Sequence, residues 1–328
     1  MDLAYRPLGR SGLVVSTLGI GCNAFGARVD ADGVRSIVDA ALDVGVNFFD
    51  TADTYSLGAS EELLGAALKG RRDDVVVATK FGMDMDGRNG ADHGARASRR
   101  YVRRAVEASL RRLGTDWIDL YQLHQLDLVT PVEETLSALD ELVTEGKVRY
   151  LGCSNFAGWQ VTEAHWVART RGLQGFVTAQ NEYSLYNRVA EDELVPACLH
   201  AGVGLLPYFP LAYGLLTGKY SGGTAPEGSR LSAASQQHRL ESADFSRVDA
   251  LQGYADARGL DLLTVAISGL AAQPAVGSVI AGVSRPEQVR TNAAAATWEP
   301  SPEDLTALAA LNRDPLPGMT SRSYTRRF

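Results

Sequence analysis

Short apolar runs rich in valine, isoleucine, leucine and aromatic residues recur about every thirty residues along the chain, and a helical pattern follows most of them. Their hydrophobicity is continuous rather than alternating, which is typical of strands that are buried on both faces. Such strands, separated by helices, predict parallel βαβ units, and a series of eight predicts a (β/α)8 TIM barrel. The predicted strands are Thr17–Gly21, Asn47–Asp50, Asp74–Thr79, Ile118–His124, Val148–Ser154, Phe176–Asn181, Gly204–Tyr208 and Ser278–Ala281.

The helices between these strands have recognisable start and stop residues. Thr130, Pro131 and Glu133 supply a predicted N-cap, a first-turn proline and a capping-box glutamate, followed by apolar residues at helical spacing. Ser98 similarly precedes a second helical pattern, which Gly114 ends. The helix predictions therefore rest on capping as well as on periodicity.

Three stretches depart from this repeat. Tyr5–Val15, with glycines between short apolar pieces, predicts an N-terminal β-hairpin that could plug the floor of the barrel. Gly82–Ala97 and a Gly/Ser/Pro-rich stretch from Gly214 to about Ser242 predict long loops at the C-terminal face of the barrel, the second of them an active-site loop. No composition break indicates a linker, so residues 1–328 are predicted to form one domain, with a flexible tail at 313–328.

Composition and charge exclude several classes of partner. A net charge of −7 and a pI near 5.3 provide no broad basic surface for nucleic-acid phosphates. No apolar run approaches the roughly 18 residues that a membrane helix needs, and the N-terminus lacks the apolar core of a signal peptide. Cys22, Cys153 and Cys198 lack metal-ligand spacing, which favours reduced thiols in a cytoplasm. We therefore expect a soluble cytoplasmic protein whose partner is a small molecule.

Polar residues stand where three consecutive predicted strands end. Asp50, Lys80 and His124 occupy these ends, and Tyr55 lies a few residues beyond Asp50. Because side chains at the carboxyl ends of barrel strands converge on one face, these four residues are candidates for catalysis.

Each of the four residues has a chemical role if they meet. An ammonium lowers the pKa of an adjacent phenol, so Lys80 would make Tyr55 a usable acid and base near working pH. Asp50 would keep Lys80 charged and oriented, while His124 would align a substrate carbonyl through a hydrogen bond. The set handles protons but carries no hydride, so it predicts carbonyl reduction with a nicotinamide cofactor.

Seven motifs, in order along nearly the whole chain, resemble those of the aldo-keto reductase family, in the branch that contains bacterial reductases and potassium-channel β subunits. They are NFFDTADTYSLGASEELLG, TKFG, IDLYQLHQLD, GCSNF, QNEYSLYNR, PYFPLAYGLLTGKY and AGVSRPEQVRTN. The resemblance implies an NAD(P)H-dependent reductase of aldehydes or ketones. It also implies that Asp50, Tyr55, Lys80 and His124 are the catalytic tetrad, with no position substituted.

The sequence has no dinucleotide fingerprint of the Rossmann type, because no GxGxxG follows a strand. The segment GLLTGKY lacks the spacing and the hydroxyl residue of a phosphate loop, which argues against an NTPase. Ser284-Arg285-Pro286-Glu287 predicts a helix amino terminus with a capping box, whose N–H groups and dipole attract phosphate. From the residues alone, an ordinary capped surface helix with a solvated Arg285 is the favoured interpretation.

The resemblance assigns nucleotide contacts along the chain. Ser154, Asn155 and Gln180 are implied to bind the nicotinamide carboxamide, Tyr208 to stack on its ring, and the GLLTGKY loop to lie over the dinucleotide. The implied cofactor contacts are Gly21, Cys22, Asn23, Ser154, Asn155, Gln180, Tyr208, Pro210, Leu211, Gly214, Lys219, Gly282, Ser284, Arg285, Gln288 and Asn292. No chemistry is assigned to the Cys22 thiol. NADPH is favoured and NAD stays possible: position 288 is glutamine, but Arg285 or Arg290 could pair with a 2′-phosphate.

The substrate and two other functions stay open at this level. Phe25 and Trp159, with Tyr55 and His124, are the predicted pocket wall, suited to small, aromatic or sugar-derived carbonyls. The alternatives are an NADP-binding redox sensor or regulatory subunit with little turnover, and a Schiff-base aldolase that uses Lys80. No metal is predicted, because the other histidines show no ligand spacing; they are His93, His165, His200 and His238. Oligomeric state and reaction direction are not determined.

Overall fold

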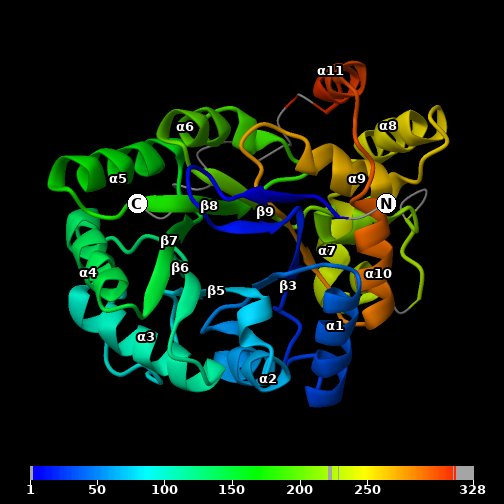
Figure 1. Ribbon diagram of the computed structural model, residues 1–328. Coiled ribbons are helices and arrows are strands. Elements are labelled where there is room, and N and C mark those ends of the chain that lie inside the picture. Colours follow the sequence, from blue (N-terminus) through cyan, green and yellow to red (C-terminus); the bar gives the residue numbers. More distant parts are fainter. Residues whose placement is uncertain (1–2, 221–223, 228, 313, 315–328) are drawn as a thin grey trace.

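The computed structural model describes residues 3–220, 224–227, 229–312 and 314. Eight parallel strands follow the order β10-β3-β4-β5-β6-β7-β8-β9, and hydrogen bonds from Leu205 to Ala275 and from Gly277 to Leu205 join the two ends of this sheet. Figure 1 shows helices surrounding the strands, so the predicted (β/α)8 barrel is confirmed. The barrel strands are β3 (Leu18–Gly21), β4 (Phe48–Asp50), β5 (Val76–Phe81), β6 (Ile118–Leu123), β7 (Val148–Ser154), β8 (Phe176–Glu182), β9 (Gly204–Tyr208) and β10 (Val279–Gly282).

The predicted strands differ from the observed ones by at most two residues at either end. The largest difference is in β5, because Arg72–Asp74 form a 3-10 turn (η2) and delay the start of the strand to Val76. The strand then continues to Phe81, so Lys80 lies inside the strand rather than just after its end. This placement holds the lysine backbone in the sheet.

Helices connect and cover the strands. They are α1 (Ala31–Asp43), α2 (Ala59–Ala67), α3 (Arg99–Leu113), α4 (Val132–Thr144), α5 (Gly158–Arg171), α6 (Leu194–Ala201), α7 (Gln237–Glu241), α8 (Phe245–Asp256), α9 (Leu262–Ala271), α10 (Pro286–Ala295) and α11 (Pro302–Ala310). Short 3-10 helices are η1 (Tyr55–Gly58), η3 (Val189–Glu191), η4 (Ala212–Thr217), η5 (Arg230–Ser232) and η6 (Ala234–Gln236). The predicted loop from Gly214 to Ser242 therefore contains several single turns and α7, while residues 221–223 and 228 lie outside the described chain.

The predicted helix ends are confirmed for α3 and corrected for α4. α3 begins after Ser98 and ends at Gly114, whose φ of 63° is the left-handed conformation that glycine adopts readily. In α4 the N-cap is Pro131, so the prediction that Thr130 caps the helix is wrong. The Thr130 hydroxyl instead donates to Asp127 at 2.9 Å, because that carboxylate organises the preceding loop.

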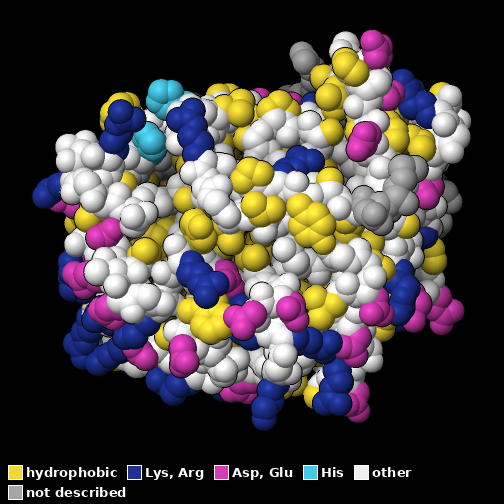
Figure 2. All heavy atoms as spheres, viewed as in Figure 1, with side chains coloured by type: hydrophobic (Ala, Val, Ile, Leu, Met, Phe, Trp, Pro, Cys, Tyr) yellow, Lys and Arg dark blue, Asp and Glu magenta, His cyan; other side chains and the backbone are white. Residues whose placement is uncertain are grey.

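The N-terminal segment forms the predicted hairpin, with β1 (Tyr5–Pro7) antiparallel to β2 (Val14–Ser16). Figure 1 shows this blue segment lying across one end of the barrel, and Figure 2 shows hydrophobic side chains gathered over the middle of the same face. At the hairpin tip, Gly9 has φ 55°, and a Cβ there would lie 2.5 Å from the carbonyl oxygen of Val177. Only glycine lets the hairpin approach the strands this closely.

The hairpin segment closes the barrel floor with buried apolar side chains. Leu8 is fully buried in a cluster inside the lower half of the barrel, together with Leu13 and Val15, so the expectation that the hairpin plugs the floor is met. The barrel-strand residues of this cluster are Phe48, Ala78, Leu120, Leu206 and Ile280. A separate and larger apolar cluster packs the helices against the outside of the sheet.

The predicted tail falls almost wholly outside the described chain, at residues 313 and 315–328. Among the described residues, no helix is long and apolar enough to cross a membrane. The same part of the chain contains no group of three histidine, cysteine, aspartate or glutamate side chains arranged to hold a metal ion.

Candidate active site

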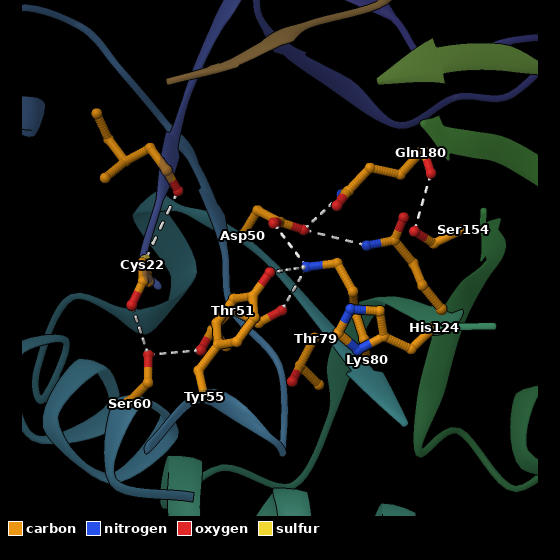
Figure 3. Close-up of polar contacts among 12 residues, drawn as sticks. Cys22, Asp50, Thr51, Tyr55, Ser60, Thr79, Lys80, His124, Ser154 and Gln180 are labelled. Carbon is orange, nitrogen blue, oxygen red and sulfur yellow. Dashed lines mark hydrogen bonds and ion pairs between the residues drawn. The ribbon is translucent and has the colours of Figure 1, made fainter. Parts of the chain in front are cut away.

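The four predicted catalytic residues meet at the C-terminal end of the barrel (Figure 3). Asp50 ends β4, Lys80 is the penultimate residue of β5, His124 directly follows β6, and Tyr55 begins η1. Asp50 pairs with Ala78, two residues before Lys80 on the same face of β5, and Lys80 pairs with Gln122 of β6. The long side chains of Lys80 and Gln122 both reach the Asp50 carboxylate from these neighbouring strands.

Lys80 is the centre of the site and is fully buried. Its Nζ donates to Asp50 Oδ2 at 2.7 Å, to the Thr51 carbonyl at 2.8 Å and to the Tyr55 hydroxyl at 3.3 Å. These bonds use all three hydrogens of the ammonium. A buried charge is stable only when it is paired and hydrogen-bonded, and this geometry meets both conditions.

The loop that carries Tyr55 is fastened at both ends. The Ser60 hydroxyl donates to the Cys22 carbonyl at 2.9 Å and lies 2.8 Å from the Thr51 hydroxyl (Figure 3). Ser56, directly after Tyr55, has φ 51°, a conformation that is strained for a residue other than glycine. The surrounding bonds therefore hold a turn that local sequence preferences would not choose.

Burial changes the acid–base properties predicted from the sequence. Burial raises the pKa of Tyr55 above its ordinary value, and the opposing effect of Lys80 does not cancel this, so the expected lowering of that pKa is wrong for the structure. Burial opposes charge on Lys80, but Asp50 and Tyr55 outweigh it and raise the lysine pKa. The phenol is therefore neutral and the amine charged near pH 7. A charged lysine is a poor Schiff-base nucleophile, which argues against the aldolase alternative.

His124 is neutral at ordinary pH. Burial, assisted by the positive charge of Lys80, lowers its pKa to about 3. Its ring lies edge-on to Tyr55, with centroids 6.0 Å apart and an interplanar angle of 82°. Both side chains line the same cavity, so a neutral imidazole and a neutral phenol face the space where a substrate would bind.

Sequence reasoning missed Gln122, which lies inside the barrel two residues before His124. Its Nε2 donates to Asp50 Oδ1 at 3.1 Å, and Gln180 donates to the same oxygen at 2.8 Å. The available signal was a glutamine two residues after Leu120, on the same inward face of the strand, since residues two apart share a face. Its partner on another strand was not visible in the sequence.

A large cavity, about 1670 Å³, opens above this site. That volume exceeds the usual range of about 300–1,000 Å³ for small-ligand sites and has room for a dinucleotide together with a substrate. Most of the predicted cofactor contacts line it: Gly21, Asn23, Ser154, Asn155, Gln180, Tyr208, Pro210, Leu211, Gly214, Lys219, Gly282, Ser284, Arg285 and Gln288. Cys22 and Asn292 do not; both side chains are buried in the protein, and burial raises the pKa of the Cys22 thiol.

The predicted carboxamide contacts bond to one another. The Ser154 hydroxyl donates to the Gln180 carbonyl, while the Asn155 amide donates to the His124 carbonyl and to Ser154. The Tyr208 hydroxyl donates to Asn155 Oδ1 at 2.8 Å. With Gln180 Nε2 held by Asp50, the Gln180 side-chain oxygen is left as an acceptor in the cavity wall, which suits a carboxamide NH₂ group.

At the other end of the cavity, α10 presents its amino terminus. The helix begins at Pro286 and its N-cap is Arg285, so the predicted capping box that starts at Ser284 is wrong by one residue. The Gln288 side-chain oxygen instead accepts from the backbone and hydroxyl of Ser284, at 2.8 and 3.2 Å. Arg285 lines the cavity, whereas Arg290 is exposed on α10 away from it. The helix end and Arg285 together fit a phosphate.

The predicted substrate wall needs correction. Phe25 is fully buried in the core, and Trp159 lies 47% exposed on α5; neither lines the cavity. Apolar residues of two other loops line the cavity mouth instead. Leu126, Leu128 and Val129 lie in the loop after β6, which continues directly from His124, and Met83 lies in the loop after β5; we call these four residues the apolar ledge.

Comparisons with known proteins agree with this geometry. Residues 17–313 match the model of the aldo/keto reductase family. The chain is 37% identical to a probable voltage-gated potassium channel subunit beta of Arabidopsis thaliana, over 88% of this chain and 90% of that protein. It is 38% identical to the oxidoreductase YrpG of Bacillus subtilis, over 88% and 89% of the two chains. It is 33% identical to versiconal hemiacetal acetate reductase of Aspergillus parasiticus, over 92% and 95%. The chain belongs to the aldo/keto reductase family.

Proposed function

We propose that this chain reduces aldehydes or ketones to alcohols with NAD(P)H, and that Tyr55 is the general acid. The observation that carries the proposal is the bond from the buried Lys80 ammonium to the Tyr55 hydroxyl at 3.3 Å, at the base of a cavity large enough for cofactor and substrate. The family is one of oxidoreductases that generally use nicotinamide cofactors.

The side chains divide the work of carbonyl reduction between them. A reduced nicotinamide, when bound, supplies the hydride that bonds to the carbonyl carbon. Tyr55 gives its proton to the carbonyl oxygen as negative charge develops there, and Lys80 stabilises the phenolate that remains. His124, neutral in the structure, aligns the carbonyl by donating an N–H. The product is the alcohol, and Tyr55 regains its proton from solvent.

NADPH is the proposed cofactor, with NAD as the alternative. Arg285 at the amino terminus of α10 can pair with a phosphate, and the helix end adds N–H groups that point at an anion. Gln288 is fixed by Ser284 and contributes no charge. The preference for NADPH therefore depends on Arg285.

The proposed substrates carry an apolar body next to the carbonyl. Leu128 and Val129 are 60% and 65% exposed at the cavity mouth, and each is too apolar to gain from contact with water. Their loop is held in place by Asp127, which accepts bonds from the Val129 backbone and the Thr130 hydroxyl, both at 2.9 Å. A fixed apolar surface near His124 favours aromatic or long-chain aldehydes over sugar-derived carbonyls.

A carbonyl panel that follows NADPH and NADH consumption in parallel tests these proposals. Tyr55→Phe should lower turnover by about 10²–10⁴-fold, the usual size of general acid catalysis, while cofactor binding measured by fluorescence stays near wild type. Within a series of straight-chain aldehydes, each added methylene should raise kcat/KM by about fourfold until the ledge is covered. Full turnover by the Tyr55→Phe variant would reject the tyrosine mechanism.

A regulatory subunit is the second candidate, favoured by the likeness to the plant potassium channel subunit. That function predicts saturable NADPH binding with less than one turnover per binding event across the whole panel. It further predicts that a partner binds the cofactor-loaded chain and the cofactor-free chain with different affinities. Multiple turnovers with any panel aldehyde would favour the reductase.

A further inference from the structure

Asp50 is held by more than its ion pair. Its Oδ2 accepts from Lys80 at 2.7 Å, and its Oδ1 accepts from both Gln122 at 3.1 Å and Gln180 at 2.8 Å. We propose that Gln122 is a positioning residue for the reaction: it fixes the Asp50 carboxylate, and through it the Lys80 ammonium. The proposal rests on the proposed reductase function.

The orientation of Gln122 is set by this bond. Only its NH₂ end can donate to a carboxylate, so the side-chain oxygen must point away from Asp50. That oxygen is buried and has no hydrogen-bond partner among the described residues. The amide is therefore bonded in the barrel through its donor end, to Asp50, rather than through its acceptor end.

The neighbouring strand makes room for Gln122. A Cβ on Gly152 of β7 would lie 2.9 Å from Gln122 Cγ and 2.3 Å from the Thr178 hydroxyl. The glycine therefore lets a long polar side chain enter the barrel at this level. Leu120 lies two residues before Gln122 on the same face of β6 and packs in the lower half of the barrel. Gln122 is therefore a polar residue at a position where the inward face of the strand would otherwise continue as apolar.

Gln122 and Gln180 both bond to Asp50, but only Gln180 is also a proposed cofactor contact. Gln180 lines the cavity, so a bound cofactor can compete with Asp50 for its side chain. Gln122 is fully buried and does not line the cavity, so a cofactor in the cavity does not compete for its amide. It can therefore keep the carboxylate in place while Gln180 adjusts.

Gln122→Leu and Gln122→Glu test the role, with Thr178→Val as the local control. Thr178 borders the same glycine, but its hydroxyl has no partner among the described residues and does not touch Asp50. Gln122→Leu should lower kcat about tenfold, the lower end for a lost bond to a charged group, with KM and the NADPH dissociation constant within about threefold of wild type. Thr178→Val should leave all three unchanged.

Gln122→Glu gives a signature that loss of packing cannot imitate. Burial and the nearby Asp50 keep the introduced carboxyl protonated at low pH, where it can still donate to Asp50. The kcat of Gln122→Glu should therefore approach that of wild type at about pH 5.5 and fall as pH rises and the carboxyl ionises. The kcat of Gln122→Leu should be lowered at every pH in this range. Two results would overturn the proposal. One is a kcat for Gln122→Leu within twofold of wild type, and the other is a kcat for Gln122→Glu that is lowered to the same extent at about pH 5.5 and at higher pH. If Gln122→Leu does not fold, the pH response of Gln122→Glu decides.

An unfolding experiment keeps this result separate from the proposed function. If wild type reduces no carbonyl, the reductase proposal fails, and urea unfolding then tests the bond itself. Loss of a donor to the buried Asp50 carboxylate leaves its Oδ1 with one bond fewer, so Gln122→Leu should lower the free energy of unfolding more than Thr178→Val does. Equal unfolding free energies of the two variants reject Gln122 as the anchor of Asp50.

Discussion

The barrel interior has two levels built by the same strands. On each of four strands, two inward-facing residues that lie two positions apart contribute one side chain to each level. The pairs are Phe48 and Asp50 on β4, Ala78 and Lys80 on β5, Leu120 and Gln122 on β6, and Leu206 and Tyr208 on β9. The first member of each pair belongs to the apolar floor closed by Leu8, while the second belongs to the polar upper level. The lower level excludes water and stabilises the fold, whereas the upper level holds charges at fixed positions.

The difference teaches where stability and chemistry come from in this fold. Apolar side chains in the floor need only fill space, so their contribution scales with the surface they bury. Polar side chains in the upper level lose hydration and recover it only through bonds of correct geometry, such as those around Lys80. The upper level should therefore be sensitive to the loss of single atoms, and the floor to the loss of volume.

Lys80→Met is expected to have the largest effect, because it removes the centre of the upper level. Asp50 would remain buried without its counter-charge, which costs about 3–5 kcal/mol of unfolding free energy in such sites. Turnover should fall below detection as well, since Tyr55 loses the ammonium that donates to its hydroxyl. Urea unfolding and NADPH consumption measure both effects. Lys147→Met, which removes a partly exposed lysine paired with Glu107 and Glu145, is the control and should cost about 1 kcal/mol or less.

Leu8→Ala should give the next largest effect, and in stability alone. It opens a cavity in the closed floor, and such truncations cost about 2–5 kcal/mol. The kcat of the folded molecules should match wild type, because the upper level is untouched. Val14→Ala, in the same hairpin but 48% exposed, should change stability by less than about 0.5 kcal/mol. A strong fall in kcat for Leu8→Ala would show that the two levels are not independent.

The smallest expected effect is the pH dependence of stability due to His124. Its pKa in the folded chain is about 3, while in an unfolded chain it is about 6.5. Between these values the unfolded chain binds the proton and the folded chain does not, so stability falls as pH falls below about 6.5. His124→Gln removes this proton, so the variant should gain about 1–2 kcal/mol relative to wild type between pH 7 and pH 5. A constant difference in unfolding free energy at the two pH values would mean that the pKa of His124 is the same in the folded and the unfolded chain.

Prediction from the sequence succeeded where local patterns carry the information. Eight continuous apolar runs predicted the barrel strands to within two residues, and glycine positions predicted the hairpin and the end of α3. The polar strand ends at Asp50, Lys80 and His124 indicated a site because parallel strands bring their carboxyl ends together. Tyr55 was a candidate because it lies a few residues beyond Asp50, and the resemblance to a family then supplied most of the cavity contacts.

Prediction failed where the outcome depends on contacts between distant segments. Phe25 is as apolar as Leu128, and nothing local shows that the first packs into the core while the second faces the cavity mouth. The N-cap of α10 moved by one residue because the Gln288 side chain bonds to Ser284 instead of leaving Ser284 to cap the helix. The direction of the Tyr55 pKa shift depended on how deeply the phenol is buried, which is a property of the assembled site.

The sequence alone determined the series of strands and helices, the residues at the strand ends and the net negative charge, because these depend on residue type and spacing along the chain. The tertiary structure decided which inward-facing residues bond to one another, how far the phenol and the imidazole are removed from water, and which loop borders the cavity. Hydrogen bonds and desolvation act over a few ångströms in space, between residues such as Asp50 and Gln180 that lie far apart in the chain.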